Sequence, residues 1–423
     1  MRILVLSNEV WNDKINGNNV TTNWFEGMNA EFANIYASPG TPDNNCCNKY
    51  YQITDKMMLN SIIKRKKAGK VIVQSGIDSN DTTAESEPKK LYEFLKSISG
   101  NILRFIRELL WLFGKYDELS LREFVDDFQP DVIFSERMAT CKMLRLEKKI
   151  HGITNAPFFA FTGDDEYSLK QFSFSPSFWI NRFMTRKRLR NNVRFYKVYY
   201  TLSYEQKEYY EKIFGCKCKI LQKCGEFDSD YVEHKVKEPI KLIYAGKFYC
   251  NRWKVLAQIS ETLKKINDSG KKAILEIYTK DKPTKKQSKL LNDGINSFIK
   301  GPVSQEELRK IYHESDIALH VESSDLKNRL ATRFSFSTKI IDCIFSGCAV
   351  LAFCWNQHSG LTYLKREDAA LCVSSKEELY AVLSKICENP QIICDYSYKA
   401  YVCGKQNHDK KQVQKMLLDD FSK

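Results

Sequence analysis

The sequence contains little glycine and proline and no long uninterrupted apolar run. Its 423 residues include 18 glycines and 10 prolines, too few for a collagen-like repeat or a largely disordered chain. The 43% of hydrophobic and 13% of aromatic residues are ample for a buried core. A chain of this length is expected to form two domains of roughly 200 residues each.

Signals for export or membrane insertion are also missing. The apolar run near the N-terminus, Ile3 to Leu6, is far shorter than the h-region of a secretory signal. The uncharged stretch 343–364 is interrupted by glycines and polar residues, which indicates a helix end, a buried strand and a loop. We expect a cytoplasmic protein, and leave open a peripheral contact with the inner face of the membrane.

The 14 cysteines do not follow a zinc-binding pattern. Cys46 and Cys47 are adjacent, and a single residue separates Cys216 from Cys218, where zinc sites usually have two. No matching second pair follows at ligand spacing. Because a reducing compartment keeps scattered thiols free, the sequence predicts neither disulfides nor a metal site.

Short apolar runs alternate with amphipathic, charged segments, and the alternation occurs twice. This pattern is typical of repeated βα units around a mostly parallel sheet. The strand candidates are 3–6, 34–37, 131–135, 157–161 and 197–202 in the first half, and 241–245, 273–278, 297–299, 317–321, 349–353 and 370–373 in the second.

The two series of strands predict an α/β protein with two Rossmann-like, doubly wound parallel-sheet domains that face a cleft. The domains are placed at 1–225 and 240–400, with a polar linker at 226–239 that lacks apolar periodicity. Residues 401–423 are expected to form a C-terminal helix, and its return to the N-terminal domain is left open. Ligands of such sheets bind beyond the carboxyl ends of the strands.

A first cluster of candidate site residues follows the first strand of the second half. Gly246 and Lys247 close this strand, and Arg252 and Lys254 lie within the same short loop. Glycine permits a tight turn while the cations converge on the strand end, where a diphosphate would satisfy their charge. A solvated basic loop is the alternative interpretation.

A second cluster lies at a predicted helix start. Ser337 or Thr338 suits the N-cap position of a helix that ends before Gly347. Free amides at this helix start, with Lys339 in the first turn, form an anion site. Asp342, about one turn farther along, is placed to reach sugar hydroxyls. An ordinary cap followed by a surface acid is the alternative.

Residues 240–353 resemble the nucleotide-binding domain of a GT-B glycosyltransferase close to family 4. That family has a Gly-Arg loop with a Lys five positions beyond its Arg, and Gly246-Lys247 and Arg252 stand at these places with Lys and Arg exchanged. The family's Ser-Lys-x-x-Glu helix start, followed by Gly and a Pro-Val strand, is similar to residues 338–342 and 347–350.

The resemblance extends to further positions and includes one departure. The family's paired acids fall at Phe334 and Asp342, so the first is missing, and Glu322 is a nearby replacement. The turn where backbone groups meet the nucleobase is similar to 301–304, with Gly301 and Val303, although alone this is only a helix start after a strand.

In the first half the resemblance is weaker. The family's glycine loop under the donor phosphates is similar to 16–22, which contains Gly17; a surface turn with an N-cap is the rival interpretation. Asp164 and Asp165 close another strand, near where similar enzymes often place an acceptor-side His. Either would orient the attacking hydroxyl, and a structural role at the turn is the alternative.

The formal charge of +14 favours an acidic partner such as a phosphate ester, an anionic lipid or a nucleic acid. Residues 178–197 contain seven Lys or Arg and no acid, with Arg182, Arg186, Arg190 and Arg194 at helical spacing. This stretch is interpreted as an interfacial helix on anionic lipid. A second apolar helix candidate, 102–113, is expected to be core.

The resemblance implies a retaining hexosyltransferase that moves a sugar from a nucleotide-diphosphate sugar, with a UDP-sugar as the expected donor. The acceptor would be a saccharide or lipid-linked saccharide in surface-polysaccharide synthesis, such as capsule or O-antigen. Lys247 and Arg252 would neutralise the leaving diphosphate, and Asp342 would hold the ribose. No metal or other cofactor is required, because basic residues replace the cation.

Two alternatives remain at this point. The first is a nucleotide-sugar epimerase on the same fold. The second is a non-catalytic basic scaffold or nucleic-acid-binding protein, but the cations gather at strand-to-helix turns and not on one face with stacking aromatics, so no nucleic acid is expected as partner.

Overall fold

The computed structural model describes residues 1–14, 20–73, 100–137, 140–226 and 231–423. The chain divides into two compact units: unit 1 is Met1–Gln222 with Val413–Lys423, and unit 2 is Lys223–Gln412. The structure therefore assigns residues 223–239, and 401–412 of the C-terminal segment, to unit 2. Each unit is built on a sheet of its own.

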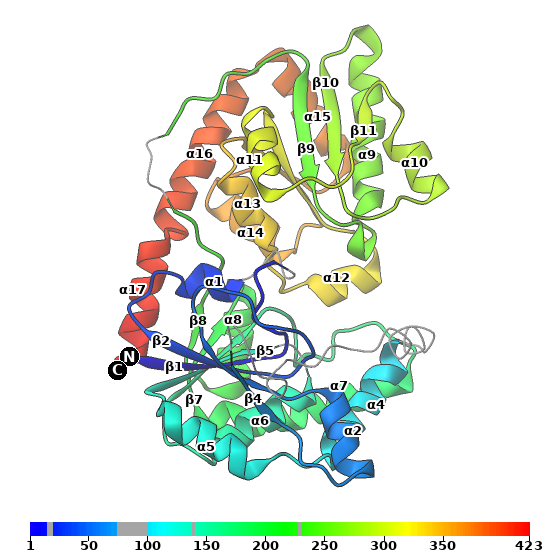
Figure 1. Cartoon of the computed structure of the whole chain (residues 1–423). Coiled ribbons are helices and arrows are strands. Elements are labelled where there is room, and N and C mark those ends of the chain that lie inside the picture. The colour runs from blue at the N-terminus through cyan, green and yellow to red at the C-terminus, as the bar shows by residue number, and fades with distance from the viewer. Residues whose placement is uncertain (15–19, 74–99, 138–139, 227–230) are drawn as a thin grey trace. The chain divides into compact units, whose positions relative to one another are not determined.

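Unit 1 contains an eight-stranded sheet of order β4-β3-β2-β1-β5-β6-β7-β8 (Figure 1). Neighbouring strands are parallel except for the antiparallel pair β3 and β4. The strands are β1 Arg2–Ser7, β2 Glu31–Tyr36, β3 Lys49–Gln52, β4 Lys70–Val73, β5 Val132–Arg137, β6 Phe158–Thr162, β7 Tyr196–Thr201 and β8 Cys218–Ile220.

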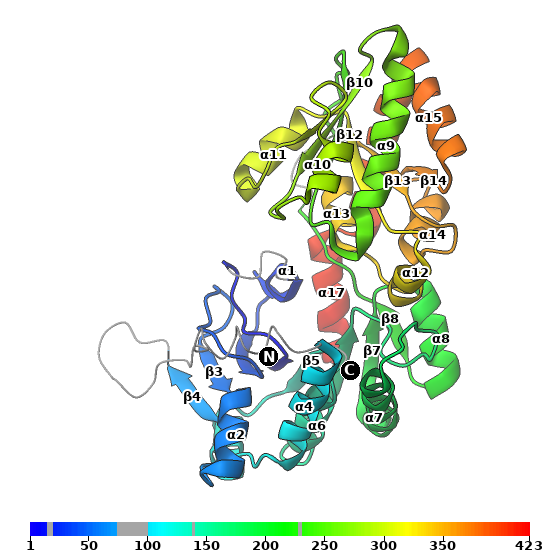
Figure 2. The same cartoon turned by 90° about the vertical axis from the view of Figure 1, so that its right-hand side faces the viewer.

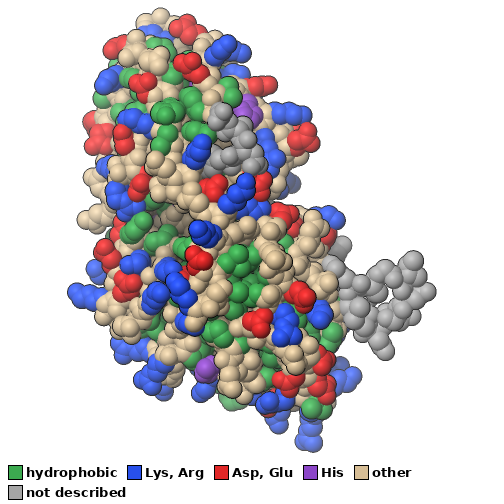
Figure 3. All heavy atoms as spheres, turned by 90° about the vertical axis from the view of Figure 1, so that its left-hand side faces the viewer, with side chains coloured by type: hydrophobic (Ala, Val, Ile, Leu, Met, Phe, Trp, Pro, Cys, Tyr) green, Lys and Arg blue, Asp and Glu red, His purple; other side chains and the backbone are tan. Residues whose placement is uncertain are grey.

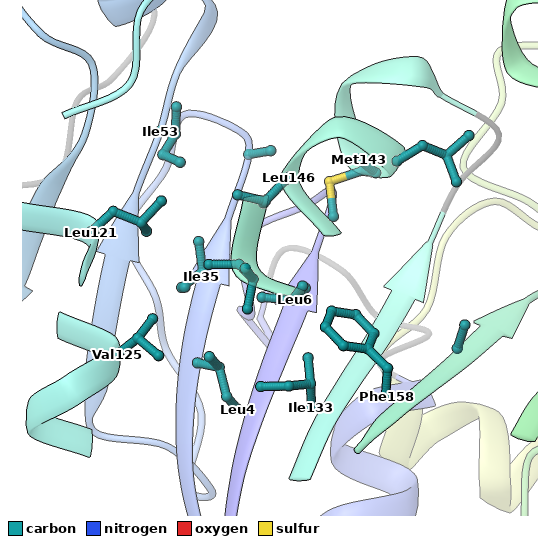
Figure 4. Packing of buried hydrophobic residues seen from close by; sticks show 14 of the residues in the cluster. Leu4, Leu6, Ile35, Ile53, Leu121, Val125, Ile133, Met143, Leu146 and Phe158 are labelled. Atoms are coloured by element: carbon teal, nitrogen blue, oxygen red, sulfur yellow. The ribbon is translucent and has the colours of Figure 1, made fainter. Parts of the chain in front are cut away.

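Helices connect these strands and supply the other half of the core. They are α1 Val20–Phe25, α2 Asp55–Ile63, α4 Gly100–Phe113, α5 Glu118–Phe128, α6 Cys141–His151, α7 Pro176–Asn192 and α8 Tyr204–Phe214. Figure 4 shows how Leu4 and Leu6 of β1 and Ile133 of β5 face Val125 of α5 and Leu146 of α6. Burial of such apolar runs explains why the sequence forms strands here.

The last helix is α17 (Lys410–Phe421), and its part from Val413 onward completes unit 1. Its Phe421 packs against Phe159, with ring centroids 4.8 Å apart, and also against Phe134 of β5. The carboxylate of Asp420 accepts hydrogen bonds from Tyr200 at 2.9 Å and from Lys219 at 2.5 Å. The end of the chain is therefore fixed by core contacts and by an ion pair.

Unit 2 contains a six-stranded sheet of order β11-β10-β9-β12-β13-β14 (Figure 2), and all its neighbouring strands are parallel. The strands are β9 Ile240–Ala245, β10 Ala273–Tyr278, β11 Ser297–Ile299, β12 Ile317–Val321, β13 Ala349–Phe353 and β14 Leu371–Val373. The helices are α9 Arg252–Ile266, α10 Lys285–Leu291, α11 Gln305–His313, α12 Leu326–Thr332, α13 Thr338–Ile344, α14 Ser359–Arg366, α15 Lys376–Glu388 and α16 Gln391–Asn407.

The strand order of unit 2 reverses direction between β9 and β12. Starting from β9, successive strands are added outward on one side as far as β11 and then on the other as far as β14. Such a switch point leaves a crevice at the carboxyl ends of the two central strands. The residues that follow β9 and β12 are therefore the first to examine for a site.

Among the described residues, no helix combines the length and the apolar character that crossing a membrane requires.

Candidate functional site

The loop that follows β9 has an unusual backbone. Cys250 and Asn251 have φ angles of 54° and 61°, in the left-handed region that non-glycine residues rarely adopt. Asn251 is then the N-cap residue of α9. Strained backbone of this kind clusters at functional sites, and nothing in the sequence pattern indicated it.

Arg252, the first residue of α9, forms a buried ion pair with Glu322, which directly follows β12. Its Nε donates to Glu322 Oε2 at 3.1 Å, and its Nη2 donates to Oε1. The two side chains are only 15% and 3% exposed, so the pair lies inside the crevice of the switch point. Glu322 thus fixes the direction of the Arg252 guanidinium.

Lys339, in the first turn of α13, reaches back to the end of β9. Its Nζ donates a hydrogen bond to Tyr244 Oη at 3.2 Å and lies 4.7 Å from the centre of that ring. A Cβ added to Gly246 would lie 1.6 Å from this Nζ. Glycine is therefore required at position 246 for the ammonium group to lie over the strand end.

The ammonium group of Lys339 is destabilised in this position. Burial lowers the pKa of Lys339 from 10.5 to about 8, with the nearby Arg252 charge adding to the effect. Two cations therefore lie close together at the carboxyl ends of β9 and β12. An anion bound beside these two cations would stabilise the charged form of Lys339.

Ser337 is the N-cap residue of α13, as predicted, but its hydroxyl forms no capping hydrogen bond, and Thr338 begins the helix. Asp342, one turn farther on, is paired with Lys223. The carboxylate predicted to hold a ribose is therefore engaged by another side chain of unit 2. A ligand would have to displace or share this contact.

The remaining cations of the first cluster differ from each other. The side chain of Lys247 is exposed, and its carbonyl accepts a hydrogen bond from Tyr244 Oη at 2.7 Å. Lys254 instead forms an ion pair with Asp325 at 2.9 Å, and Asn251 donates to the same carboxylate. The structure therefore brings Arg252 and Lys339 together, and holds Lys254 at Asp325.

Four other positions singled out in the sequence lie elsewhere or outside the described part. Gly301, with φ of 88°, and Val303 follow β11, an edge strand that β10 separates from β9. Gly17 lies outside the described residues. Phe334, which stands where the family has its first acid, is buried, with the Arg333 guanidinium 4.0 Å from its ring centre.

In unit 1, the two candidate acids after β6 have different surroundings. The Asp165 side chain is 1% exposed and pairs with Arg182 at 3.2 Å, and it accepts hydrogen bonds from the amides of Tyr167 and Ser168. Asp164 is exposed, and its carbonyl accepts a hydrogen bond from Gln206 at 2.8 Å. Asp165 therefore holds the loop in place, whereas Asp164 is exposed.

Sequence reasoning missed one further carboxylate of unit 1. Glu136, near the end of β5, accepts a hydrogen bond from Thr21 Oγ1 at 2.6 Å and lies beside Ser7 in the β1–β5 register. Burial raises the pKa of Glu136, and Glu9 adds to the shift. This carboxylate is at the β1–β5 switch point. The sequence did not reveal it, because a single Glu near the end of a strand forms no motif with its neighbours.

One group of side chains in the described part of unit 2 has the composition of a metal site. Ligand atoms of His320, Cys354 and His358 lie within 4.8 Å of one another, and all three residues are buried. However, Nδ1 of His358 accepts a hydrogen bond from the Gly360 amide at 3.2 Å, which puts the imidazole proton on Nε2. Burial also raises the pKa of the Cys354 thiol. This geometry suits neutral, protonated side chains, and we assign no metal to them.

No protein-family profile matches the chain, and no curated protein matches it by sequence. Solved structures resemble it over its whole length. The HepE protein of Anabaena, solved in complex with UDP, has a TM-score of 0.63 at 10% identity, with 100% of both chains covered. Sucrose-phosphate synthase of Thermosynechococcus elongatus has a TM-score of 0.60 at 9% identity, over 99% of this chain and 98% of that one.

A third similar structure is WaaG, a glycosyltransferase involved in lipopolysaccharide biosynthesis, with a TM-score of 0.56 at 11% identity and 99% of each chain covered. At such identities a likeness shows the fold and leaves substrates and residue roles to separate argument. The two parallel sheets and these neighbours together show that the chain has the GT-B fold, which is the fold class that the sequence predicted.

Proposed function

We propose that the protein is a hexosyltransferase that transfers a sugar from a nucleotide-diphosphate sugar to a saccharide or lipid-linked saccharide. The observation that carries the proposal is the arrangement of Arg252 and Lys339 at the β9–β12 switch point, where Lys339 lies over Gly246. Glu322 balances only one of these two buried positive charges, and an excess buried charge is costly unless a further anion joins it. A diphosphate has the charge and the oxygen geometry that such a site needs.

In this proposal unit 2 binds the donor. Arg252, held by Glu322, and Lys339 bind the diphosphate, while Lys247 supplies a third, exposed charge. The amides that begin α13 fix the other face of the diphosphate, and Asp342 binds the ribose after releasing Lys223. UDP is the proposed nucleotide, in keeping with the UDP found in HepE. No metal is proposed, because these side chains supply the positive charge.

We also propose that transfer retains the anomeric configuration. The acceptor oxygen bonds to the anomeric carbon on the face that the diphosphate leaves, the bond from that carbon to the phosphate oxygen breaks, and the departing phosphate takes the hydroxyl proton. Arg252 and Lys339 stabilise the charge that develops on the leaving oxygen. Asp164 would orient the acceptor hydroxyl.

The stereochemistry can be measured directly. NMR of the first product formed should show the same anomeric configuration as the donor. An inverted product would contradict the retaining mechanism and would instead require a base, for which Glu136, with its raised pKa, is the described candidate. A donor epimerised without any acceptor would contradict transfer altogether.

The donor site is tested by matched lysine variants. Lys339→Met and Lys247→Ala should each lower the rate of transfer by at least about tenfold, because each removes a positive charge that would bind the diphosphate. Lys254→Ala is the control, since its ammonium is held by Asp325. The proposal fails if Lys339→Met and Lys254→Ala have equal, near-normal rates and both are folded.

The acceptor side of the proposal includes contact with an anionic membrane, but through different residues from those predicted. Arg182 donates to the Ser168 carbonyl, Arg186 donates to the Tyr167 carbonyl, and Arg190 donates to Tyr167 Oη. These three arginines of α7 therefore hold the loop after β6. They do not form the lipid-facing stripe that their spacing suggested.

Exposed apolar side chains on α2, α4, α7 and the segment before α7 offer a better surface. The expectation that 102–113 is core is wrong in part, because several apolar side chains of α4 are exposed. Helix α4 packs against both α2 and α7, so these elements lie together. The exposed set comprises Ile62, Ile63, Ile102, Ile106, Phe113, Phe172, Phe174, Ile180 and Phe183. Phe174 is 89% exposed, Lys187 is an exposed cation of α7, and the exposed Arg194 lies just beyond the end of that helix. Apolar side chains beside cations suit an interfacial contact.

Vesicle co-sedimentation tests this surface. Binding should rise with the anionic lipid content, and Phe174→Ser with Phe183→Ser should reduce it, while Ile295→Ser in unit 2, also an exposed apolar residue, should not. Equal binding of all three proteins would remove the membrane from the proposal. On the face drawn in Figure 3, Lys and Arg are interspersed with Asp and Glu on both units, which does not favour a nucleic-acid surface.

A further inference from the structure

Unit 1 carries a pocket whose lining is rich in cations. Its volume is about 480 Å³, and it is lined by Tyr116, Glu118, Arg122, Arg145, Lys148, Lys149, Gly152 and Ile153. Four cations thus face one acid. The donor site proposed above makes no use of any of these residues.

The pocket lies away from the edge of the sheet that the acceptor would use. Helix α6 starts after the carboxyl end of β5 and leads to the amino end of β6, so Lys148 and Lys149 near its C-terminus belong to the amino edge. Glu136 and Asp164 lie at the opposite, carboxyl edge. The pocket is therefore a separate site.

Two of the lining residues carry buried polar atoms that lack partners. Neither Tyr116 Oη nor Arg145 Nη1 has a hydrogen-bond partner in the described part of the chain, although both atoms are buried, and Tyr116 is 7% exposed. Arg145 Nη2 is satisfied by the Leu112 carbonyl at 3.1 Å, which holds the guanidinium in place. Buried donors without acceptors are rare and costly in native proteins.

The charges around these two atoms are also unbalanced. Among the described residues, Arg122, Arg145 and Lys148 have no carboxylate within ion-pair distance, while Lys149 pairs with Glu118 at 2.6 Å. Burial raises the pKa of Tyr116 to about 12, so its hydroxyl stays protonated and can donate. The excess of positive charge among the lining residues suits an anion with several oxygens.

We propose that this pocket binds the phosphoryl group of a small, soluble phosphate compound. The guanidinium of Arg145 and the ammonium groups of Lys148 and Lys149, with Arg122, neutralise the phosphoryl charge and donate to its oxygens. Guanidinium groups suit the oxygen geometry of phosphate, and the volume leaves room for a sugar or nucleoside attached to it. The site is additional to the proposed donor site and does not depend on it.

Equilibrium dialysis with labelled inorganic pyrophosphate tests the proposal on the full chain. Four proteins are compared: wild type, Arg145→Gln with Lys148→Gln, the donor-site variant Lys339→Met with Lys247→Ala, and the control Lys212→Ala, which removes an exposed cation of α8. Loss of two charged contacts should weaken one class of bound pyrophosphate by at least about tenfold. Lys148→Gln alone, at an exposed residue, gives a smaller loss and keeps the test valid if Arg145→Gln does not fold.

The outcomes separate this site from the donor site. Weaker pyrophosphate binding by the Arg145 variant supports the pocket, whatever the donor-site variant does. If the donor-site variant then binds like wild type, the pocket is supported and the donor site is not. Equal binding by the Arg145, Lys148 and Lys212 variants overturns the pocket and means that ordered water satisfies its buried atoms. Competition by a sugar phosphate and by a nucleoside monophosphate then identifies which kind of phosphate compound fits, and sulfate that competes equally with both overturns it as an adventitious ion only.

Discussion

Raising the pH should weaken donor binding through a single residue, Lys339. Burial and the nearby Arg252 charge lower the pKa of this ammonium group to about 8 in the protein without ligand. Below that pH the group is charged and attracts a diphosphate. Above it the group is neutral, so binding must first recover a proton.

The size of the effect follows from the fraction of Lys339 that is charged. With a pKa of about 8, roughly nine-tenths of the molecules carry the charge at pH 7 and roughly one-tenth at pH 9. If the charged form alone binds, the dissociation constant of UDP rises about tenfold between these values, which equals about 1.4 kcal/mol. The bound diphosphate raises the pKa of Lys339, so the complex takes up a proton in this range.

Isothermal titration of UDP at several pH values measures this dependence, and Lys339→Arg is the matched control. Arginine keeps its charge throughout the range, so the variant should lose the pH dependence while it experiences the same titration of the ligand. A tenfold change that persists in Lys339→Arg would place the titrating group elsewhere. A wild-type affinity that does not change between pH 7 and 9 would refute the reasoning about burial.

Three further predictions concern single side chains. Gly246→Ala should weaken UDP binding by at least about tenfold without unfolding unit 2, because the new Cβ displaces the flexible end of Lys339; thermal melts beside titration check this, and unchanged affinity would contradict the close approach. Glu322→Gln should lower the free energy of unfolding by about 3 kcal/mol, because it leaves the buried Arg252 charge unpaired. Asp325→Asn, at a more exposed ion pair, should lower it by under about 1 kcal/mol. Urea titrations measure both losses, and equal losses would argue against the burial of the Arg252–Glu322 pair. Asp165→Asn should destabilise unit 1 through the loss of its bond to Arg182, while Asp164→Asn should lower turnover at an unchanged melting temperature; the reverse result would exchange the roles of the two acids.

The central strands of both sheets could be predicted from the sequence because they are buried on both faces. Residues 273–278, 317–321 and 349–353 form strands with the predicted bounds, and so does the short edge strand 297–299. The short strands β3, β4 and β8 were missed. Each has three or four residues at or next to the edge of its sheet, so a continuous apolar run is not required and the periodicity signal is absent.

The candidate site could be predicted less completely, for a reason that the ion pairs illustrate. Strand-to-helix turns with Gly246 and Lys339 identified the switch point, because glycine and a cation next to a helix start are local signals. The partners of Arg252, Lys254 and Asp342 lie 70, 71 and 119 positions away in the chain. A single sequence contains no information on such pairings, so it could not show which of these charged side chains are already paired with another residue of the chain.

The division of the chain has a consequence for the order in which the protein folds during synthesis. Unit 2 is inserted in the sequence of unit 1, whose last segment is Val413–Lys423. The ribosome therefore releases all of Lys223–Gln412 before it releases Phe421 and Asp420, which complete the contacts with Phe159 and Tyr200. The first unit to be translated is the last to be finished, and a nascent chain carries it with an uncovered aromatic surface until Phe421 has been added.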